Sequence, residues 1–143
     1  MTDWSYGVAV QEVRGDYVVS VRDLPEVVTS GNDFQEALAL AADAIEVAIV
    51  GRMEDDMLLP RPSGVRIGEH AVAVPAQLAA KAAVYSAWKD ARLSKVELAR
   101  RLERNEAEVR RILNPRHGTK LDQLEEAARA LGGRLNVSFE TSS

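Results

Sequence analysis

The hydrophobic pattern of this 143-residue chain changes its period at Pro75, and that change most limits how the chain can fold. Before Pro75, apolar residues recur at every second position in the runs 4–13 and 17–24, which is typical of half-buried strands. The residues between the runs form a turn, so the two strands are expected to pair as a β-hairpin. After Pro75 the apolar spacing becomes helical. The pattern therefore predicts two modules, 1–75 and 76–143.

The remainder of the first module predicts one helix between two short strands. Residues 27–30 read as a strand, and Asp33 followed by Glu36 matches a capping box with aspartate as the cap. The helix should run to about Met53, and residues 70–75 read as a further strand. Its apolar stripe consists of Phe34, Ala37, Leu38, Ala41, Ile45, Ala48 and Ile49. The first module is thus expected to be β-β-β-α-β, of the α+β class.

The second module reads as a set of helices followed by a lone strand. A first helix carries Leu78, Ala82, Tyr85 and Trp88 on one face, two short helices follow within 93–113, and another begins at Thr119 or Lys120 and stops at Gly132-Gly133. Residues 134–140 then alternate, with apolar side chains at Leu135, Val137 and Phe139. A terminal strand with one apolar face needs a partner edge, so we expect it to pair with its equivalent in a second chain, with these three residues in the dimer contact. Docking onto the sheet of the first module is the alternative.

Charge divides at the same place as the hydrophobic period. Residues 1–75 contain 5 basic and 13 acidic side chains, a net charge of −8, whereas residues 76–143 contain 13 basic and 9 acidic ones, a net charge of +4. A basic module can meet phosphate, and an acidic module repels it but can dock on a basic protein. The split predicts two modules with different partners.

The segment 93–113, LSKVELARRLERNEAEVRRIL, has the spacing of a helix-turn-helix. With Lys95 as the first position, Ala99 is the small residue needed where the helices pack closest, and Val109 fills the angle between them. The second helix of such a motif lies in the major groove with its early residues at base edges. The turn usually contains glycine, because its backbone is left-handed there; Glu103 stands at that position, at a strain of about 1 kcal/mol.

Candidate DNA contacts follow from this placement. Glu106 and Glu108 can accept hydrogen bonds from cytosine, although both also suit the positive end of the helix dipole. Residues 95–120 include 8 basic and 4 acidic side chains, and the cations can hold phosphates, which supply most of the affinity. The candidate DNA-binding residues are Lys95, Asn105, Glu106, Glu108, Arg110, Arg111, Arg116, His117, Thr119 and Lys120. The alternative is a degenerate motif kept for helix packing or dimerisation.

Catalysis and metal binding find little support in the sequence. The chain has no cysteine, which excludes a disulfide framework and a thiolate zinc site. His70 and His117 have neither a nucleophile nearby nor a partner at metal-ligand spacing. Turn and cap chemistry explains Asp16, Asp23 and Asp33. We expect no enzymatic activity, no metal and no cofactor.

A membrane or secreted location is also not expected. The longest mostly apolar stretch, 37–51, carries two acids and is too short to span a bilayer. The first residues lack the basic start and apolar run of a signal peptide. The sequence therefore predicts a cytoplasmic protein without a membrane partner.

From Tyr6 to Glu46 the chain resembles the N-terminal half of HicB antitoxins. In both, a hairpin leads to an aspartate-leucine-proline and a short strand with threonine-x-glycine, and then to a capped helix rich in alanine and acids. The matching residues are Asp23-Leu24-Pro25, Thr29, Gly31, Glu36-Ala37-Leu38 and Ala42. Segments 71–102 and 116–139 resemble the branch of that family that bears a helix-turn-helix. The chain departs from it at LERNEAEV, where the family usually has a glycine turn and a polar cap.

The resemblance implies a partial ribonuclease-H-like domain at 1–75, without nuclease activity, and a helix-turn-helix DNA-binding and dimerisation domain with a terminal β-strand at 76–143. It implies that the first domain binds and neutralises a HicA-like toxin, a small basic mRNA-cleaving ribonuclease. The second domain would repress the operon by binding operator DNA as a dimer or a dimer of dimers. An orphan HicB-like regulator without a toxin, and a protein-interaction module with a decayed helix-turn-helix, remain as alternatives.

Overall fold

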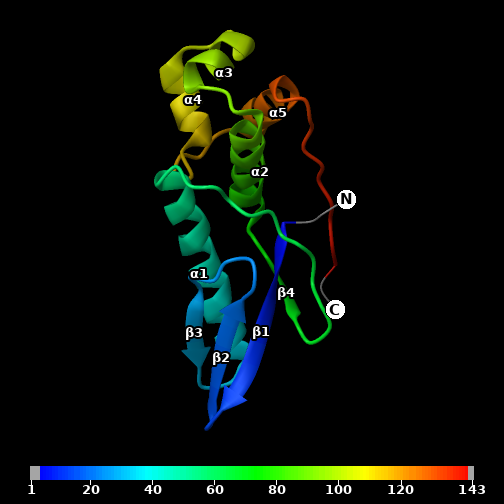
Figure 1. The fold of residues 1–143 in the computed structure, drawn as a ribbon. Helices are drawn as coiled ribbons and strands as arrows, with labels where there is room; N and C mark the ends of the chain where they lie inside the picture. The colour runs from blue at the N-terminus through cyan, green and yellow to red at the C-terminus, as the bar shows by residue number, and fades with distance from the viewer. Residues whose placement is uncertain (1–3, 142–143) are drawn as a thin grey trace.

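The structure, a computed structural model, describes residues 4–141 and consists of a sheet-containing part and a helical part (Figure 1). The first part contains β1 (Ser5–Val13), β2 (Asp16–Val21), β3 (Val28–Gly31), α1 (Phe34–Glu54) and β4 (His70–Ala73). The second contains α2 (Ala76–Ala91), α3 (Lys95–Leu102), α4 (Glu106–Leu113) and α5 (Leu121–Ala130). The predicted α+β class and the β-β-β-α-β order of the first module are confirmed.

A turn made of Arg14 and Gly15 joins β1 to β2. Both residues have positive φ, 53° for Arg14 and 88° for Gly15, as a type I′ turn requires. This turn matches the twist of the flanking strands, and the resulting register pairs Val10 with Val19. The predicted hairpin is confirmed, and its register sends alternate apolar residues of both strands to one face of the sheet.

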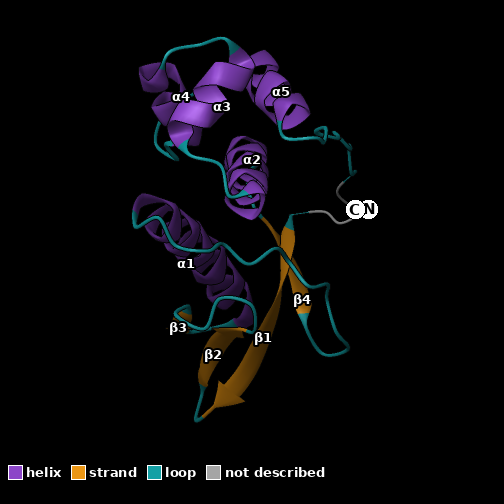
Figure 2. Ribbon diagram, turned by 45° about the horizontal axis from the view of Figure 1, so that its top comes forward, coloured by secondary structure: helices purple, strands orange, loops and turns teal. Residues whose placement is uncertain are grey.

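The sheet has the strand order β3-β2-β1-β4, and every neighbouring pair is antiparallel. Helix α1 covers one face of it (Figure 2). The strands present Tyr6, Val8, Val19 and Val21 to this core, each at most 2% exposed. The helix contributes a stripe at a spacing of four residues, Ala37, Ala41, Ile45, Ile49 and Met53.

The start of α1 is fixed by a cap and by a close backbone contact. Asp33 Oδ1 accepts a hydrogen bond from the amide of Glu36 at 2.8 Å, and the Glu36 carboxylate accepts one from the amide of Asn32 at 3.1 Å. Asp33 is the cap, as predicted, whereas Glu36 reaches back to the amide one residue before the cap rather than to that of Asp33, as a standard capping box would require. A Cβ on Gly31 would lie 2.6 Å from the backbone nitrogen of Ala37, so only glycine lets β3 approach the first turn of α1 this closely.

The loop between α1 and β4 is tied to the sheet by polar contacts. The Tyr6 hydroxyl donates to the carbonyl of Pro60 at 2.7 Å, and burial raises the pKa of Tyr6 to about 12. Asp23 accepts from the amide of Ser63 at 2.9 Å, while Arg22 donates to Glu69 at 2.9 Å. Asp23, the first residue of the aspartate-leucine-proline motif, therefore holds this loop in place.

Helix α2 lies between the sheet-containing part and the other helices (Figure 2). Its predicted inner residues Ala82, Tyr85 and Trp88 are buried. The Tyr85 hydroxyl donates to the carbonyl of Met57 at 2.7 Å, which joins α2 to the loop after α1. Within residues 4–141, no helix combines the length and the apolar character needed to cross a membrane.

The predicted terminal β-strand is not formed in the single chain. Helix α5 ends as expected, with Gly132 at a φ of 85° and the amide of Gly133 bonded to the carbonyl of Ala128 at 2.9 Å. The residues beyond have no regular secondary structure up to residue 141, and Val137 and Phe139 are 83% and 90% exposed. The reason is physical: a strand needs a neighbour to bond its backbone, and no strand of the described chain pairs with this segment.

Candidate nucleic-acid interface

Side-chain caps define the start of both α3 and α4. Ser94 Oγ accepts a hydrogen bond from the amide of Glu97 at 3.0 Å, and Asn105 Oδ1 accepts one from the amide of Glu108 at 2.8 Å. Each bond satisfies one of the backbone donors that a helix leaves free in its first turn. Asn105, a predicted DNA contact, therefore already serves as the cap of α4.

The turn between α3 and α4 adopts the expected left-handed conformation without glycine. Glu103 has φ 55° and ψ 42°. Its amide bonds to the carbonyl of Arg100 at 3.2 Å, and the amide of Arg104 bonds to the carbonyl of Ala99 at 3.0 Å. These two bonds form the Schellman arrangement that ends many helices. The Glu103 side chain is exposed, so only its backbone is constrained.

A small apolar core fixes the angle between α3 and α4. Ala99 is 6% exposed and Val109 is fully buried, as the spacing predicted. The other buried residues of the two helices are Leu98, Leu102, Ile112 and Leu113. Because these side chains fill the space between the helices, the polar residues of α4 face outward.

Arg104 lies in the turn, at a position where a helix-turn-helix usually has an apolar residue, and it has a structural role. Its guanidinium contacts Glu126 of α5 at 2.7 Å and Glu108 of α4 at 3.9 Å. Arg104 thereby links the turn to the two helices that follow it. Glu108, one of the two glutamates expected to read bases, has this arginine as a cationic neighbour within the chain.

The other predicted contacts on α3 and α4 lie on an exposed surface. Glu106 pairs with Arg110 at 2.8 Å, one helical turn away. Arg111 is exposed, and no ion pair involves it within residues 4–141. Lys95 lies 5.9 Å above the ring of Trp88, and both Lys95 and Arg110 line a hollow of about 410 Å³ beside the end of α1.

The loop after α4 contains the remaining candidates. Arg116 pairs with Glu54 of α1 at 2.6 Å, and its guanidinium holds the pKa of that carboxyl below its ordinary value. His117 and Lys120 are exposed. Thr119 is only 3% exposed and so does not lie on the surface on which the sequence placed it. The structure therefore brings nine of the ten predicted residues to the surface or its rim and places Thr119 beneath it.

Lys81 is a buried residue that supports the candidate interface and was not predicted from the sequence. It lies on α2, is 1% exposed, and donates hydrogen bonds of 2.9–3.0 Å to the carbonyls of Arg111, Ile112 and Asn114. It also donates to the Thr119 hydroxyl at 2.7 Å. Burial lowers the pKa of Lys81 to about 8, so the amine still carries its charge at neutral pH.

The position of this ammonium suits the end of a helix. The last carbonyls of a helix lack partners within it and carry partial negative charge. Lys81 satisfies three carbonyls at the end of α4 from the protein interior and fixes the start of the loop that carries Arg116, His117 and Lys120. One detectable signal was its spacing, because Lys81 falls three residues after Leu78 within the apolar face of α2.

Two of the acidic residues considered in the sequence have structural partners in the chain. Residues 4–141 contain no group of three histidine or acidic side chains that could hold a metal ion. Asp33 caps α1 and Asp23 binds the loop at Ser63. The site is thus a surface of cations supported by a helix pair.

Comparison with known proteins gives the family. Residues 4–83 match the family model described as the HicB-like antitoxin of bacterial toxin–antitoxin systems. The chain is 38% identical over 136 residues to Antitoxin HicB 1 of Photorhabdus laumondii, covering 94% of this chain and 86% of that protein. It is 37% identical over 124 residues to Antitoxin HicB of Escherichia coli, covering 87% and 90%. A third relative, Antitoxin HicB of Pseudomonas fluorescens, is 31% identical over 140 residues, covering 97% and 96%.

The chain is therefore an α+β protein of the antitoxin class, in which a sheet-containing module precedes a helical one. It belongs to the HicB-like antitoxins of bacterial toxin–antitoxin systems. The resemblance inferred from the hairpin, the aspartate-leucine-proline motif and the capped helix is confirmed.

Proposed function

We propose that this antitoxin neutralises a HicA-like mRNA-cleaving toxin with residues 1–75 and represses its own operon with residues 76–143. The observation that carries both halves is the charge split, −8 in the first module and +4 in the second, on a chain of this family. The element order of the first module is the one expected of a partial ribonuclease-H-like domain, and the helix pair α3–α4 is the proposed helix-turn-helix.

The outer face of α1 is the best candidate for contact with the toxin. Leu40 and Val47 are 36% and 73% exposed, and they alternate with Glu36 and Asp43 at helical spacing. No basic residue lies between Glu36 and Val47. A basic toxin would be attracted by the acids and anchored by the two apolar side chains.

Co-expression tests this role. The antitoxin and the small open reading frame beside its gene should copurify and should restore growth that the toxin alone arrests. The double variant Asp43→Lys/Val47→Asp should lose both the copurification and the growth, whereas Val96→Asp, at another exposed position on α3, should keep them. Loss of neither in the double variant would exclude the α1 face. Failure of the unaltered pair to copurify and to restore growth would favour the orphan-regulator alternative.

The proposed DNA reader is α4 together with the loop that follows it. Arg110, Arg111 and Lys120 are exposed there. Ala99 and Val109 meet the packing needs of the motif, and the left-handed Glu103 supports the turn geometry that a helix-turn-helix uses. Lys81 holds α4 from behind, and we assign Thr119 a supporting role in that same contact rather than a DNA contact.

Each predicted contact has a distinct expected effect on binding. Arg111→Ala should weaken binding to the preferred sequence by about 1–3 kcal/mol if Arg111 reads a guanine, and should weaken all sequences by a smaller, similar amount if it holds a phosphate. Glu106 and Glu108 should reduce non-specific binding because their carboxylates repel the phosphate backbone of DNA. Titration of operator and unrelated DNA with each variant distinguishes these outcomes.

A single helix-turn-helix offers little contact area, so we propose that two copies bind half-sites about one helical turn apart. The exposed apolar side chains of Val137 and Phe139 support dimerisation through the C-terminal residues, in line with the prediction made for Leu135, Val137 and Phe139. Truncation after Gly133 should leave a monomer by light scattering. An unchanged dimer would place the interface elsewhere.

A further inference from the structure

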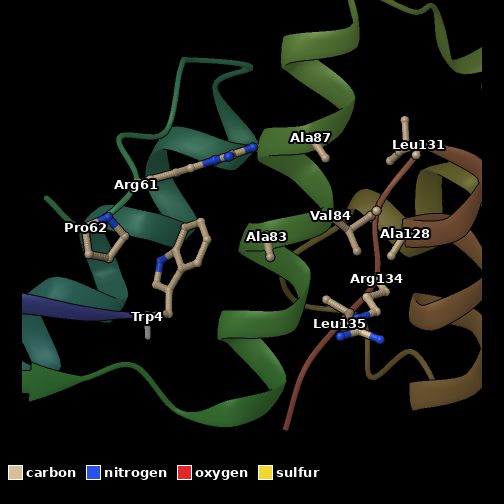
Figure 3. A pocket seen from close by; sticks show the side chains of 12 residues that line it. Trp4, Arg61, Pro62, Ala83, Val84, Ala87, Ala128, Leu131, Arg134 and Leu135 are labelled. Atoms are coloured by element: carbon tan, nitrogen blue, oxygen red, sulfur yellow. The ribbon is translucent and has the colours of Figure 1, made fainter. Parts of the chain in front are cut away.

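A groove of about 420 Å³ lies along α2, and we call it the α2 groove. It shares no lining residue with the hollow beside the end of α1. Its floor is formed by the small residues Ala83 and Ala87 of α2 (Figure 3). Trp4 and Pro62 form one wall, and Leu131 and Leu135 form the other. Four segments far apart in the sequence therefore line the groove.

The wall of the α2 groove contains a donor without an acceptor. Trp4 Nε1 is buried from solvent and has no hydrogen-bond partner among the described residues. A buried N–H without a partner is unfavourable, and tryptophan usually finds one when buried. Because this N–H is buried, a segment that enters the groove meets the indole ring of Trp4 rather than the N–H.

Residues 134–141, which we call the tail, have the complementary properties. Leu135 is half-buried in the groove wall, whereas Val137 and Phe139 are 83% and 90% exposed. Within residues 4–141 the tail backbone makes no hydrogen bond to other backbone groups. Two large apolar side chains and a row of free carbonyls are thus exposed on one short extended segment.

The tail of the same chain is poorly placed to fill its own groove. Leu135 occupies the wall, and the tail then runs away from α5 (Figure 1). Each residue of an extended segment advances the chain by about 3.3 Å, so Val137 and Phe139 lie farther along the tail than Leu135, and both are exposed. A return into the groove would need a reversal between Leu135 and Phe139, where the sequence contains neither glycine nor proline.

The charge of the groove rim is complementary to that of the tail. The rim of the groove carries Arg61 and Arg134, and Glu140 directly follows Phe139 in the tail. Among the described residues, Arg61 pairs with Asp90 alone, in a contact in which both side chains are more than half exposed, so Arg61 can exchange this partner at little cost.

We infer that the α2 groove receives Val137 and Phe139 from the tail of a second copy of this chain, with Glu140 beside the arginines of the rim. Each copy gives its tail to the other, so the contact is two-fold and closes at a dimer. The inference rests on the proposed dimer and adds to it the surface that covers the apolar face of the tail.

Cysteine pairing tests the inference directly, because the natural chain has no cysteine. A full-length Ala87→Cys protein is mixed with a full-length Phe139→Cys protein and oxidised, and Ala107→Cys, at an exposed position of α4, replaces Ala87→Cys in the control. We expect a disulfide-linked heterodimer only in the first mixture. In parallel, Phe139→Ser should raise the dimer dissociation constant roughly 100-fold or more, because two phenyl groups lose their burial, while Val96→Ser leaves it unchanged.

The outcomes separate this inference from the proposed dimer. A dimer that survives Phe139→Ser and gives no cross-link at Ala87 overturns the groove inference and leaves the dimer standing. A cross-link within one chain of the double cysteine variant, at a dilution where the chain is monomeric, shows that the tail fills its own groove and also overturns it. A wild-type chain that is monomeric at all concentrations overturns the proposed dimer itself.

Discussion

Replacing Lys81 with methionine tests how the proposed recognition helix is held. Methionine has nearly the length of lysine and keeps the packing of the aliphatic stem, so the main loss is the ammonium group. In the structure this group donates to the carbonyls of Arg111, Ile112 and Asn114 and to the hydroxyl of Thr119. The variant leaves these acceptors facing an apolar side chain at the end of α4.

The size of the effect follows from two opposing contributions. The ammonium is a charged donor, and each of its three N–H groups donates a hydrogen bond of about 2 kcal/mol to these oxygens, or about 6 kcal/mol in total. Against this, burial lowers the pKa of Lys81 from 10.5 to about 8, which corresponds to a desolvation penalty of about 3 kcal/mol that methionine does not have. The expected loss of unfolding free energy is the difference, about 3 kcal/mol, or roughly 10 °C in Tm.

Urea denaturation followed by far-ultraviolet circular dichroism measures this loss. We expect the midpoint of Lys81→Met to fall at an unchanged slope, as for a change in stability alone. The matched control is Lys120→Met, at an exposed position, which should stay within about 0.5 kcal/mol of the wild type. A loss below about 1 kcal/mol for Lys81→Met would refute the reasoning, since it would mean that the carbonyls find other partners.

Three further predictions concern the backbone at glycine positions, the left-handed residue Glu103 and the buried Tyr85. Gly31→Ala should destabilise the protein by about 1–3 kcal/mol, because the new Cβ meets the backbone of Ala37. Gly51→Ala, in the last turns of α1 where a Cβ meets open space, should stabilise it by about 0.5–1 kcal/mol. Equal effects of the two variants in urea denaturation would contradict this. Glu103→Gly should raise stability by up to about 1 kcal/mol by relieving the left-handed strain, and a loss of stability would show that the strain is absent. Burial raises the pKa of Tyr85 to about 12, so the unfolded chain releases the phenol proton near pH 10 while the folded chain retains it. The stability of the wild type should therefore fall from pH 10 to 12, and that of Tyr85→Phe should fall less steeply. Parallel stability profiles of the two proteins would exclude this contribution.

Much of the fold was predictable because local signals agreed with the packing. The alternating apolar residues of the hairpin, the Asp33–Glu36 cap and the Gly132-Gly133 stop each specify local structure through short-range interactions. The same holds for Ala99 and Val109, whose sizes fit the angle between α3 and α4. The prediction of a left-handed residue at Glu103 was also correct, since the spacing of the motif, rather than the residue type, determines the backbone there.

The parts that were not predicted depend on contacts between segments distant in sequence. Lys81 lies 30–38 residues before its hydrogen-bond partners, so its role becomes visible only once α2 and α4 are packed. Thr119 was placed among the DNA contacts because it is polar and follows a basic loop, but its hydroxyl is needed by Lys81 in the interior. The pairing of Arg116 with Glu54, 62 residues earlier, likewise follows from the arrangement of the two modules.

The terminal segment shows a different limit. Its alternation predicts a strand, yet a strand is a property of a pair, and the single chain leaves residues 134–141 without a partner. The periodicity therefore describes the side of the segment that should be buried. The surface that buries it must come from packing that the sequence does not specify locally.

A salt-dependent binding titration tests the central claim, that the helical module reads DNA, most directly. Fluorescence anisotropy of the fragment upstream of the gene would be measured at about 50 mM and 200 mM salt; with three phosphate-binding cations per copy in a dimer, affinity should fall about 10³-fold between them. Charge reversal of Arg110, Arg111 and Lys120 together should abolish binding, whereas Arg14→Glu/Arg66→Glu, in the first module, should not. No binding at low salt, or binding unchanged by the triple reversal, would contradict the claim and would identify α3–α4 as a helix pair kept for packing.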